Sequence, residues 1–272
     1  MGLLDRGIEI KSPEQIDAMR LAGLVVGRTL ELMRSSARAG ISTGELDAIA
    51  EDHIRASGAT PSFKGYHGFP GSICASVNDE VVHGIPGARV LADGDLVSID
   101  CGAIVEGWHG DAAVTVAVGE VPYELHHLMQ VTEEAMWRGI AAARLGGRVT
   151  DISHAVEQHV RGAGEFGILE DYTGHGIGTQ MHQPPNVPNY GRAGRGPKLV
   201  KGLALAVEPM ITLGTKDTEL LDDDWTVVTA DGSWAAHFEH TFTLTDQGAW
   251  VLTALDGGEE MLGRLGVPFG GR

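Results

Sequence analysis

The sequence predicts an α+β fold of two similar halves, residues 1–120 and 121–255, that contribute to one sheet. Three observations support this prediction. The composition, with 43% hydrophobic and 21% charged residues, is that of an ordinary globular protein. Helical patterns followed by strand-like runs occur twice, in the same order. Two strand motifs of the first half also recur in the second half.

Each recurring motif combines an apolar run with a carboxylate. Residues 94–100 and 202–208 lead from a glycine through an apolar run to a carboxylate. Residues 111–116 and 239–244 begin with a carboxylate and continue as an alternating strand. This paired recurrence indicates an internal duplication, with one pair of carboxylates in each half.

Capping residues and apolar spacing predict two helices in each half. Ser12 and Gln15 have the spacing of a capping box, and a second start of this kind lies at residues 42–45. In the second half, Pro122 opens a long helical pattern and Thr150 is predicted to cap the next helix.

The strands are predicted from short apolar or alternating runs bounded by turn residues. The runs at 96–105 and 111–118 are expected to form a hairpin around residues 106–110. Residues 1–255 are interpreted as one catalytic domain, and the glycine-rich tail at 256–272 is predicted to be mobile. The full set of predicted strands is 72–77, 96–105, 111–118, 203–207, 225–229, 237–244 and 249–254.

Net charge and hydropathy exclude several classes of protein. With 20 basic and 37 acidic residues, the net charge of −17 disfavours binding to nucleic acid or to anionic membranes. No run of about 18 apolar residues indicates a membrane span. Cys74 and Cys101 are not in a C-x-x-C pair; a reducing compartment fits them, although one disulfide would still be possible. The start of the chain has no signal-peptide pattern, so a cytoplasmic protein is expected.

The four recurring carboxylates are the candidate metal-binding residues. If the halves are related by a pseudo-twofold axis, these side chains converge, and buried charges of one sign need a counter-charge. Neither 96–118 nor 202–215 contains lysine or arginine, so divalent metal is the simplest counter-ion. The carboxylates are Asp100, Asp111, Glu208 and Glu239.

Three histidines lie in turn-rich segments that suit a metal-binding or catalytic site. His175 stands between Gly174 and Gly176, His182 precedes two prolines, and His83 precedes a Gly-Ile-Pro-Gly turn. The histidines on helical patterns are interpreted as structural; these are His53, His126, His127 and His159.

Seven motifs in order resemble the type I methionine aminopeptidases, dinuclear metallopeptidases of the pita-bread fold. The resemblance extends from about residue 8 to 255. It implies an antiparallel sheet covered by helices on one face, with the two halves related by a pseudo-twofold axis. The motifs are Gly65-Tyr-His-Gly-Phe-Pro70, Asn78-Asp-Glu-Val-Val-His-Gly-Ile-Pro86, Ser98-Ile-Asp-Cys-Gly102, Trp108-His-Gly-Asp-Ala112, Gly174-His-Gly-Ile-Gly178, Ala206-Val-Glu-Pro-Met210 and Phe238-Glu-His-Thr241.

The resemblance implies two divalent metal ions and a role for each candidate. Asp111 and Glu239 would bridge the ions, Asp100 would chelate one, and His175 and Glu208 the other. Co²⁺, Mn²⁺, Fe²⁺ and Zn²⁺ all suit these ligands.

The implied reaction is attack of metal-activated water on the peptide bond after an N-terminal methionine, where the second residue is small. Glu208 would shuttle the proton, His182 would donate to the oxyanion, and His83 would donate to the peptide. The implied substrates are nascent proteins, with transient ribosome contact by a monomer.

The resemblance also implies an apolar methionine pocket, and here the chain departs from the family pattern. Many relatives carry an aromatic residue in place of Met181 and tyrosine in place of Phe69, and residues 189–201 are expected to form an inserted loop near the mouth. The pocket residues implied are Tyr66, Phe69, Cys74, Met181 and Trp225.

Other functions remain open at this point. They are a proline-specific aminopeptidase or dipeptidase on the same fold, a binding protein that kept the fold without catalysis, and a metal-binding or metal-storage domain.

Overall fold

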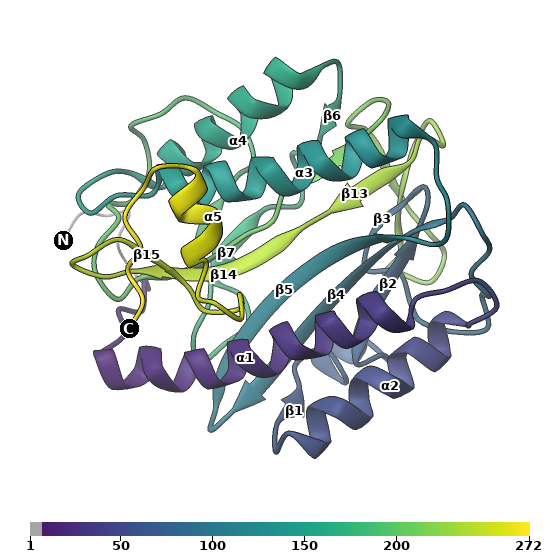
Figure 1. The fold of residues 1–272 in the computed structure, drawn as a ribbon, viewed down its shortest axis with the longest axis horizontal. Coiled ribbons are helices and arrows are strands. Elements are labelled where there is room, and N and C mark those ends of the chain that lie inside the picture. The colour runs from purple at the N-terminus through teal and green to yellow at the C-terminus, as the bar shows by residue number, and fades with distance from the viewer. Residues whose placement is uncertain (1–6) are drawn as a thin grey trace.

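The structure is a computed structural model that describes residues 7–272 of the chain. Figure 1 shows helices packed around a curled sheet. The helices are α1 (Pro13–Ser36), α2 (Thr43–Ala56), α3 (Tyr123–Ala142), α4 (Val149–Ala163) and α5 (Glu259–Arg264), with a 3₁₀ turn at Tyr66–Gly68. The strands are β1 (Thr60–Pro61), β2 (Ile73–Val77), β3 (Glu80–Val82), β4 (Leu96–Val105), β5 (Trp108–Ala117), β6 (Gly167–Ile168), β7 (Gly174–Gly176), β8 (Gln183–Val187), β9 (Ala204–Val207), β10 (Met210–Thr212), β11 (Thr218–Leu220), β12 (Val227–Thr229), β13 (Ala235–His237), β14 (Glu239–Leu244) and β15 (Ala249–Val251).

The main sheet has nine strands, and its order reflects the two halves. The central path is β1-β4-β5-β14-β9-β7-β8, with β2 on β4 and β15 on β14, and every ladder is antiparallel. The hairpin β4–β5 of the first half therefore meets the pair β14–β9 of the second half at the β5–β14 junction. The predicted α+β class and the duplicated arrangement are confirmed.

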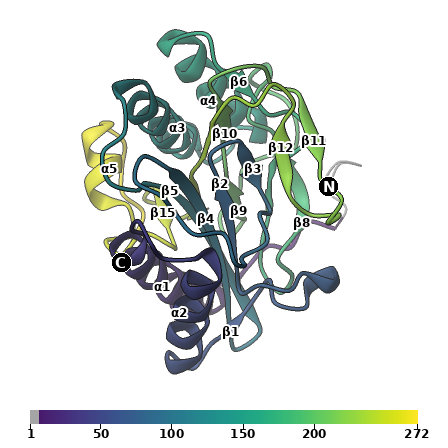
Figure 2. The same ribbon diagram turned by 90° about the vertical axis from the view of Figure 1, so that its right-hand side faces the viewer.

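The sheet separates a helical layer from a layer of strands and loops. Figure 2 shows α1, α2, α3 and α5 on one side of the sheet, and β11 and β12 on the other. Ile99 and Cys101 of β4 join the main hydrophobic core with residues of α1, such as Val26. Because side chains alternate along a strand, Asp100 faces away from the helices.

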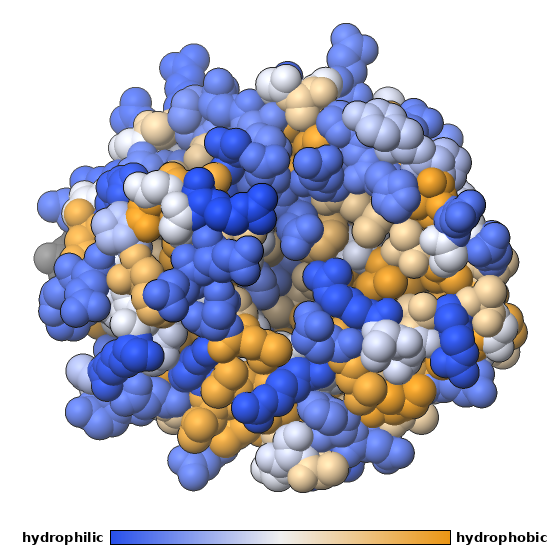
Figure 3. Space-filling view, in the orientation of Figure 1, coloured by the Kyte–Doolittle hydropathy of each residue, from blue (hydrophilic) through white to orange (hydrophobic). Residues whose placement is uncertain are grey.

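The helix-covered face is mostly polar. Figure 3 shows this face, with apolar side chains gathered in patches low on the view, where α1 lies in Figure 1. Leu21 of α1 is 52% exposed. Within residues 7–272, no helix has the length and hydropathy needed to cross a membrane.

The capping box predicted at Ser12 is present, and the helix start predicted at residues 42–45 has one too. The Ser12 hydroxyl accepts a hydrogen bond from the Gln15 backbone N–H, and the Gln15 side chain accepts one from the Ser12 N–H at 2.7 Å. Ser42 and Glu45 repeat the arrangement at the start of α2. These bonds satisfy backbone groups that a helix start would otherwise leave unpaired, which explains why local sequence alone predicted both starts.

The predicted start of the fourth helix is wrong by two residues. The helix begins at Val149 and Thr150 is not its cap. The carboxylate of Asp151 accepts from the Arg148 N–H at 2.8 Å, while the Thr150 hydroxyl donates to the carbonyl of Arg195. A contact with a distant loop therefore uses the hydroxyl that the local pattern assigned to capping.

The predicted mobile tail is also wrong. Residues 256–272 contain α5, whose Leu262 is fully buried in the main core. Beyond the helix, Phe269 bridges to Ala249 at the edge of β15. The spacing of Met261, Leu262 and Leu265 supplies an apolar face that the high glycine content of the tail obscured.

The predicted hairpin is confirmed, with a tighter turn than expected. β5 begins at Trp108 and not at residue 111, because β4 and β5 stay paired as far as Val105 and Trp108. Cys74 and Cys101 are both buried and free, so the disulfide that the sequence left open is not formed.

Candidate metal centre and active site

Strand register brings the four predicted carboxylates together. Asp100 pairs with Ala113 across β4–β5, and Ala113 pairs with Glu239 across β5–β14. Asp111 pairs with Gly102, which places it diagonally opposite Asp100 on the same face. His240 pairs with Val207, so Glu239 stands level with Glu208 at the end of β9.

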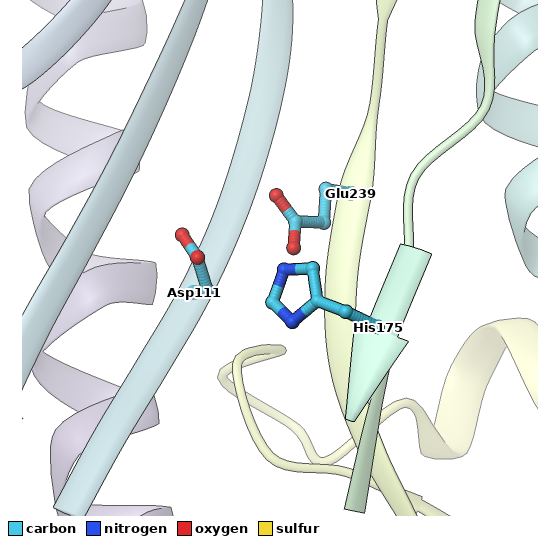
Figure 4. Close-up of side chains that lie close together, drawn as sticks. All are labelled: Asp111, His175 and Glu239. Carbon is cyan, nitrogen blue, oxygen red and sulfur yellow. The ribbon is translucent and has the colours of Figure 1, made fainter. Parts of the chain in front are cut away.

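His175 reaches the same point from β7. Figure 4 shows its ring between Asp111 of β5 and Glu239 of β14, and one ligand atom of each lies within 4.8 Å of the others. A side chain at either flanking glycine would clash, because a Cβ at Gly174 or Gly176 would lie 2.3 Å from a carbonyl oxygen of a neighbouring strand. The glycines therefore let β7 approach closely enough for the imidazole to reach the carboxylates.

The tautomer of His175 suits a metal ligand. Its Nδ1 lies 2.9 Å from the Gly176 carbonyl, which can only accept, so Nδ1 carries the proton and Nε2 has a free lone pair. Nε2 lies 3.5 Å from Oε1 of Glu208. Burial, and then the nearby His182, lower the pKa of His175 to about 3, so the imidazole is neutral at physiological pH.

The chemistry of this cluster fits a divalent cation. Oδ1 of Asp100, Oδ1 of Asp111 and Oε1 of Glu239 are buried and have no hydrogen-bond partner among residues 7–272. The described residues that line the surrounding cavity of about 140 Å³ include no lysine or arginine. Carboxylate oxygens and an imidazole without a protein counter-charge are the donors that borderline divalent metals take.

Mutual repulsion is visible in the carboxylate pKa values. Burial, followed by the charges of Glu239 and Asp100, raises the pKa of Asp111. Burial raises the pKa of Asp100 to about 7. Burial and neighbouring carboxylates raise the pKa values of Glu208 and Glu239 too. A bound cation would remove this penalty, because it favours the ionised carboxylates.

The two further predicted histidines stand at the same cavity. Nδ1 of His182 lies 2.9 Å from the Tyr66 hydroxyl, and its ring meets that of His175 edge-on at 4.3 Å. His83 packs edge-on against Trp225 and Tyr172. Its backbone is in the left-handed region, with φ near 61°. A non-glycine residue held there costs on the order of 1–3 kcal/mol and is typical of functional sites.

The predicted apolar pocket is a distinct cluster beside the carboxylates. All five predicted residues line the cavity or pack in this cluster: Tyr66, Phe69, Cys74, Met181 and Trp225. Phe63 and Val82 also line the cavity, and the sequence interpretation did not include them. Phe63 lies two residues after the short strand β1, so only the pairing of β1 with β4 brings it to the site.

His237 was also missed, although it is 1% exposed and lies against the carboxylates. Its Nε2 is 3.8 Å from Oε2 of Glu208, and these atoms form a second group of ligand atoms with Glu239. The available signal was spacing: His237 and Glu239 are two residues apart in a predicted strand, which places both side chains on one face.

The expected insertion does not stand at the mouth. No residue of 189–201 lines the cavity, and the segment packs on α4, where the Gly191 N–H donates to Glu157 at 2.9 Å. Its first residue has a different contact: the Asn189 side chain donates to the Glu208 carbonyl at 3.1 Å. The segment therefore supports the site from behind.

Comparison with known proteins agrees with this geometry. The model of metallopeptidase family M24 matches residues 17–246. A methionine aminopeptidase of Clostridium acetobutylicum is 52% identical over 247 residues, which cover 90% of this chain and 98% of that protein. Methionine aminopeptidase 1 of Mycobacterium tuberculosis is 55% identical over 254 residues, 91% of this chain and 96% of that protein.

Comparison with solved structures also finds methionine aminopeptidases. The crystal structure of methionine aminopeptidase from Thermotoga maritima superposes with a TM-score of 0.89 at 41% identity, and the match covers 91% of this chain and 99% of that chain. The resemblance predicted from the motifs is confirmed, and the alternative functions are not favoured. From the matched residues and the identity of these relatives, the chain belongs to metallopeptidase family M24.

Proposed function

We propose that this protein is a metal-dependent aminopeptidase that removes an N-terminal methionine when the second residue is small. The observation that carries the proposal is the meeting of five metal-binding side chains with an apolar cluster in one cavity. Relatives at about half identity that are named methionine aminopeptidases support the same activity. The five side chains are Asp100, Asp111, His175, Glu208 and Glu239.

The metal cofactor is a pair of divalent ions. Asp111 and Glu239 would hold both ions, because each offers two oxygens at the centre of the row of carboxylates. Asp100 would help to hold one ion, and His175 and Glu208 would help to hold the other. When bound, such ions activate water for attack and polarise the scissile carbonyl.

The remaining steps of the proposed reaction, proton transfer and hydrogen-bond donation, are carried out by side chains of the protein. Glu208 accepts the proton of the attacking water and passes it to the leaving amine. His182 donates to the developing oxyanion, and His83 donates to the peptide around the scissile bond. Burial, with nearby histidine, lowers the pKa values of both imidazoles, so each donates as a neutral group at physiological pH.

The apolar cluster is proposed as the methionine pocket. Phe63, Phe69, Cys74 and Met181 are buried in it, with Trp225 at its side. Cys74 pairs with Asp100 across β2–β4, so the pocket begins directly beside the metal centre. An unbranched thioether fits such a pocket, because sulfur packs favourably on aromatic edges.

The place of action follows from the proposed substrate. Nascent chains carry the initiator methionine, so the proposed location is the cytoplasm, with transient contact to the ribosome. We further propose that the protein acts as a monomer, because the five proposed metal ligands and the proposed pocket residues meet within a single chain.

Substrate selectivity tests the proposal. The metal-loaded protein is expected to release methionine from Met-Ala-Ser and to spare Met-Lys-Ser, because a long second side chain would collide with the walls of the site. Free methionine released from the two peptides is measured under a screen of Co²⁺, Mn²⁺, Fe²⁺ and Zn²⁺. Absence of turnover of Met-Ala-Ser with every metal would contradict the proposed function.

Replacement of His182 tests the assignment of the oxyanion donor. His182→Ala is expected to lower kcat for Met-Ala-Ser about 100-fold, the usual cost of losing one such donor. Metal stoichiometry should stay unchanged, because His182 is not a proposed ligand. His126→Ala is the control, since His126 is exposed on α3, away from the cavity. A kcat within twofold of wild type in His182→Ala would remove His182 from the mechanism.

A further inference from the structure

The backbone around His237 is fixed by contacts that aim its side chain at the metal centre. His237 pairs with Met210 across β13–β10, in the register that places Glu239 level with Glu208. The Thr115 hydroxyl accepts from the His237 N–H and donates to its carbonyl, each at 2.9 Å. Since strand side chains alternate, His237 and Glu239 share the face that carries the carboxylates.

The His237 ring has a buried nitrogen without a hydrogen-bond partner in the described chain. Nε2 is fully enclosed and makes no hydrogen bond with residues 7–272. Its nearest ionisable contact is Oε2 of Glu208 at 3.8 Å, which is too long for a hydrogen bond. A buried polar atom without a partner is costly, so its persistence in this site indicates a partner that is not part of the chain.

Nε2 of His159 on α4 is also buried without a hydrogen-bond partner. Two histidines on strands beside the site differ from His237, because each has a hydroxyl partner. His109 precedes Asp111 by two residues, as His237 precedes Glu239, but its Nδ1 lies 3.0 Å from the Ser62 hydroxyl. His240 lies on the opposite face of β14, with Nδ1 at 2.8 Å from the Thr253 hydroxyl. His109 and His240 thus each have a hydroxyl partner at Nδ1. His237, in contrast, lies beside the carboxylates of Glu208 and Glu239.

We propose that Nε2 of His237 is a sixth protein ligand of the metal centre and binds the ion that Glu208 and Glu239 share with His175. Ligand atoms of Glu208, His237 and Glu239 lie within 4.8 Å of one another. Donors about 2.0–2.2 Å from one ion are separated by no more than about twice that bond length. The 3.8 Å between Nε2 of His237 and Oε2 of Glu208 lies within this limit and suits a common ion. The proposal rests on the metal centre of the proposed function.

A second imidazole changes which metals the site prefers. Imidazole nitrogen suits Zn²⁺, Fe²⁺ and Co²⁺, whereas carboxylate oxygen suits Mn²⁺. The ion held by His175 and His237 is therefore expected to be bound more selectively in favour of Zn²⁺ and Co²⁺ over Mn²⁺. The ion on the side of Asp100, which has only carboxylate ligands, lacks this preference.

The test counts the histidines that bind metal. In Co²⁺-loaded protein, the N–H protons of coordinated imidazoles give exchangeable, strongly shifted proton NMR signals. The wild type is expected to show two, from His175 and His237, and His237→Gln and His175→Gln are each expected to show one. The matched control His240→Gln replaces a half-buried histidine of the adjoining strand and should show two.

Zn²⁺ affinity gives a second measurement, by competition with a chelator. His237→Gln is expected to raise the Zn²⁺ dissociation constant at least about 10-fold, since even residues that only orient a ligand cost about 10- to 100-fold. Glutamine can still donate a hydrogen bond to Glu208, so a purely orienting role would be largely preserved in this variant.

Specific outcomes would overturn the proposal. A single shifted N–H signal in the wild type would do so without any variant. The same holds if His237→Gln keeps two signals, or binds Zn²⁺ within twofold of wild type. Neither measurement uses a peptide substrate. Failure of the protein to release methionine would therefore contradict the proposed function alone. The number of histidine ligands would still be decided by the NMR signals.

Discussion

Asp111→Ala is expected to abolish release of methionine and to remove at least one equivalent of bound metal. Asp111 is 3% exposed and stands between Asp100 and the second half of the site. Loss of a bridging carboxylate disturbs both ions, whereas loss of one hydrogen-bond donor already costs about 100- to 1,000-fold in rate. The expected decrease in kcat is therefore more than about 1,000-fold.

Metal analysis of the purified variant is the decisive measurement, with activity on Met-Ala-Ser beside it. Asp246→Ala is the control, because Asp246 is an exposed aspartate whose ion pair with Lys201 lies at the surface. It should keep full metal content and activity. Unchanged metal stoichiometry in Asp111→Ala would show that the bridging role has been assigned to the wrong residue.

The second large effect is on the stability of the metal-free protein. Its free energy of unfolding is expected to fall as the pH rises from 7 to 8.5, because burial raises the pKa values of the four site carboxylates. Around pH 7 the unfolded carboxylates are already ionised, while Asp100, whose pKa in the folded protein is about 7, has released its proton only in part. Raising the pH therefore favours the unfolded state, by about 1.4 kcal/mol per pH unit for each retained proton.

The pH interval separates the carboxylates from other groups. Burial lowers the pKa values of histidines such as His175 and His240 to about 3, so their contribution to stability is lost on acidification, as the pH falls below about 6.5. Above pH 7 these histidines are neutral in both states. The buried thiols of Cys74 and Cys101, whose pKa values burial raises, lower the stability in the same direction as the unfolded thiols ionise near pH 8.5. The slope close to pH 7 therefore reports the carboxylates.

Thermal unfolding of metal-free and metal-loaded protein checks this expectation. Tm of the metal-free protein should fall by about 2–4 °C per pH unit between pH 7 and 8.5 for each retained proton. Saturating Co²⁺ should raise Tm and flatten the slope, because the cation keeps the carboxylates ionised in the folded state. A metal-free Tm that is constant or rises over this interval would contradict the convergence of the carboxylates.

Local signals in the sequence predicted the elements whose stabilising contacts are themselves local. The capping boxes at Ser12 and Ser42 satisfy backbone groups within four residues, so the sequence contained the whole arrangement. Thr150 has the same residue type as a cap, but its hydroxyl bonds to Arg195, and such a contact depends on the tertiary fold. Leu262 shows the same limit, because its burial depends on a core built by distant segments.

The candidate site also contains both residues that the sequence predicted and residues that it did not. The repeated carboxylates were visible as a pattern, and their convergence followed from the duplication that the sheet order confirms. Phe63 was not predicted, because nothing near it in the sequence marks its position, and His237 was not predicted although its spacing from Glu239 placed it on the same strand face. The pairing of β1 with β4 places Phe63, and the pairing of β13 with β10 places His237.

Anomalous X-ray diffraction from crystals of the metal-loaded protein is the most direct test of the central claim, that distant side chains of the two halves form one dinuclear site. Data collected above and below the absorption edge of the added metal would locate and count the ions. We expect two peaks within bonding distance of Asp100, Asp111, His175, Glu208 and Glu239. Peaks elsewhere on the protein, or none among these residues, would contradict the claim.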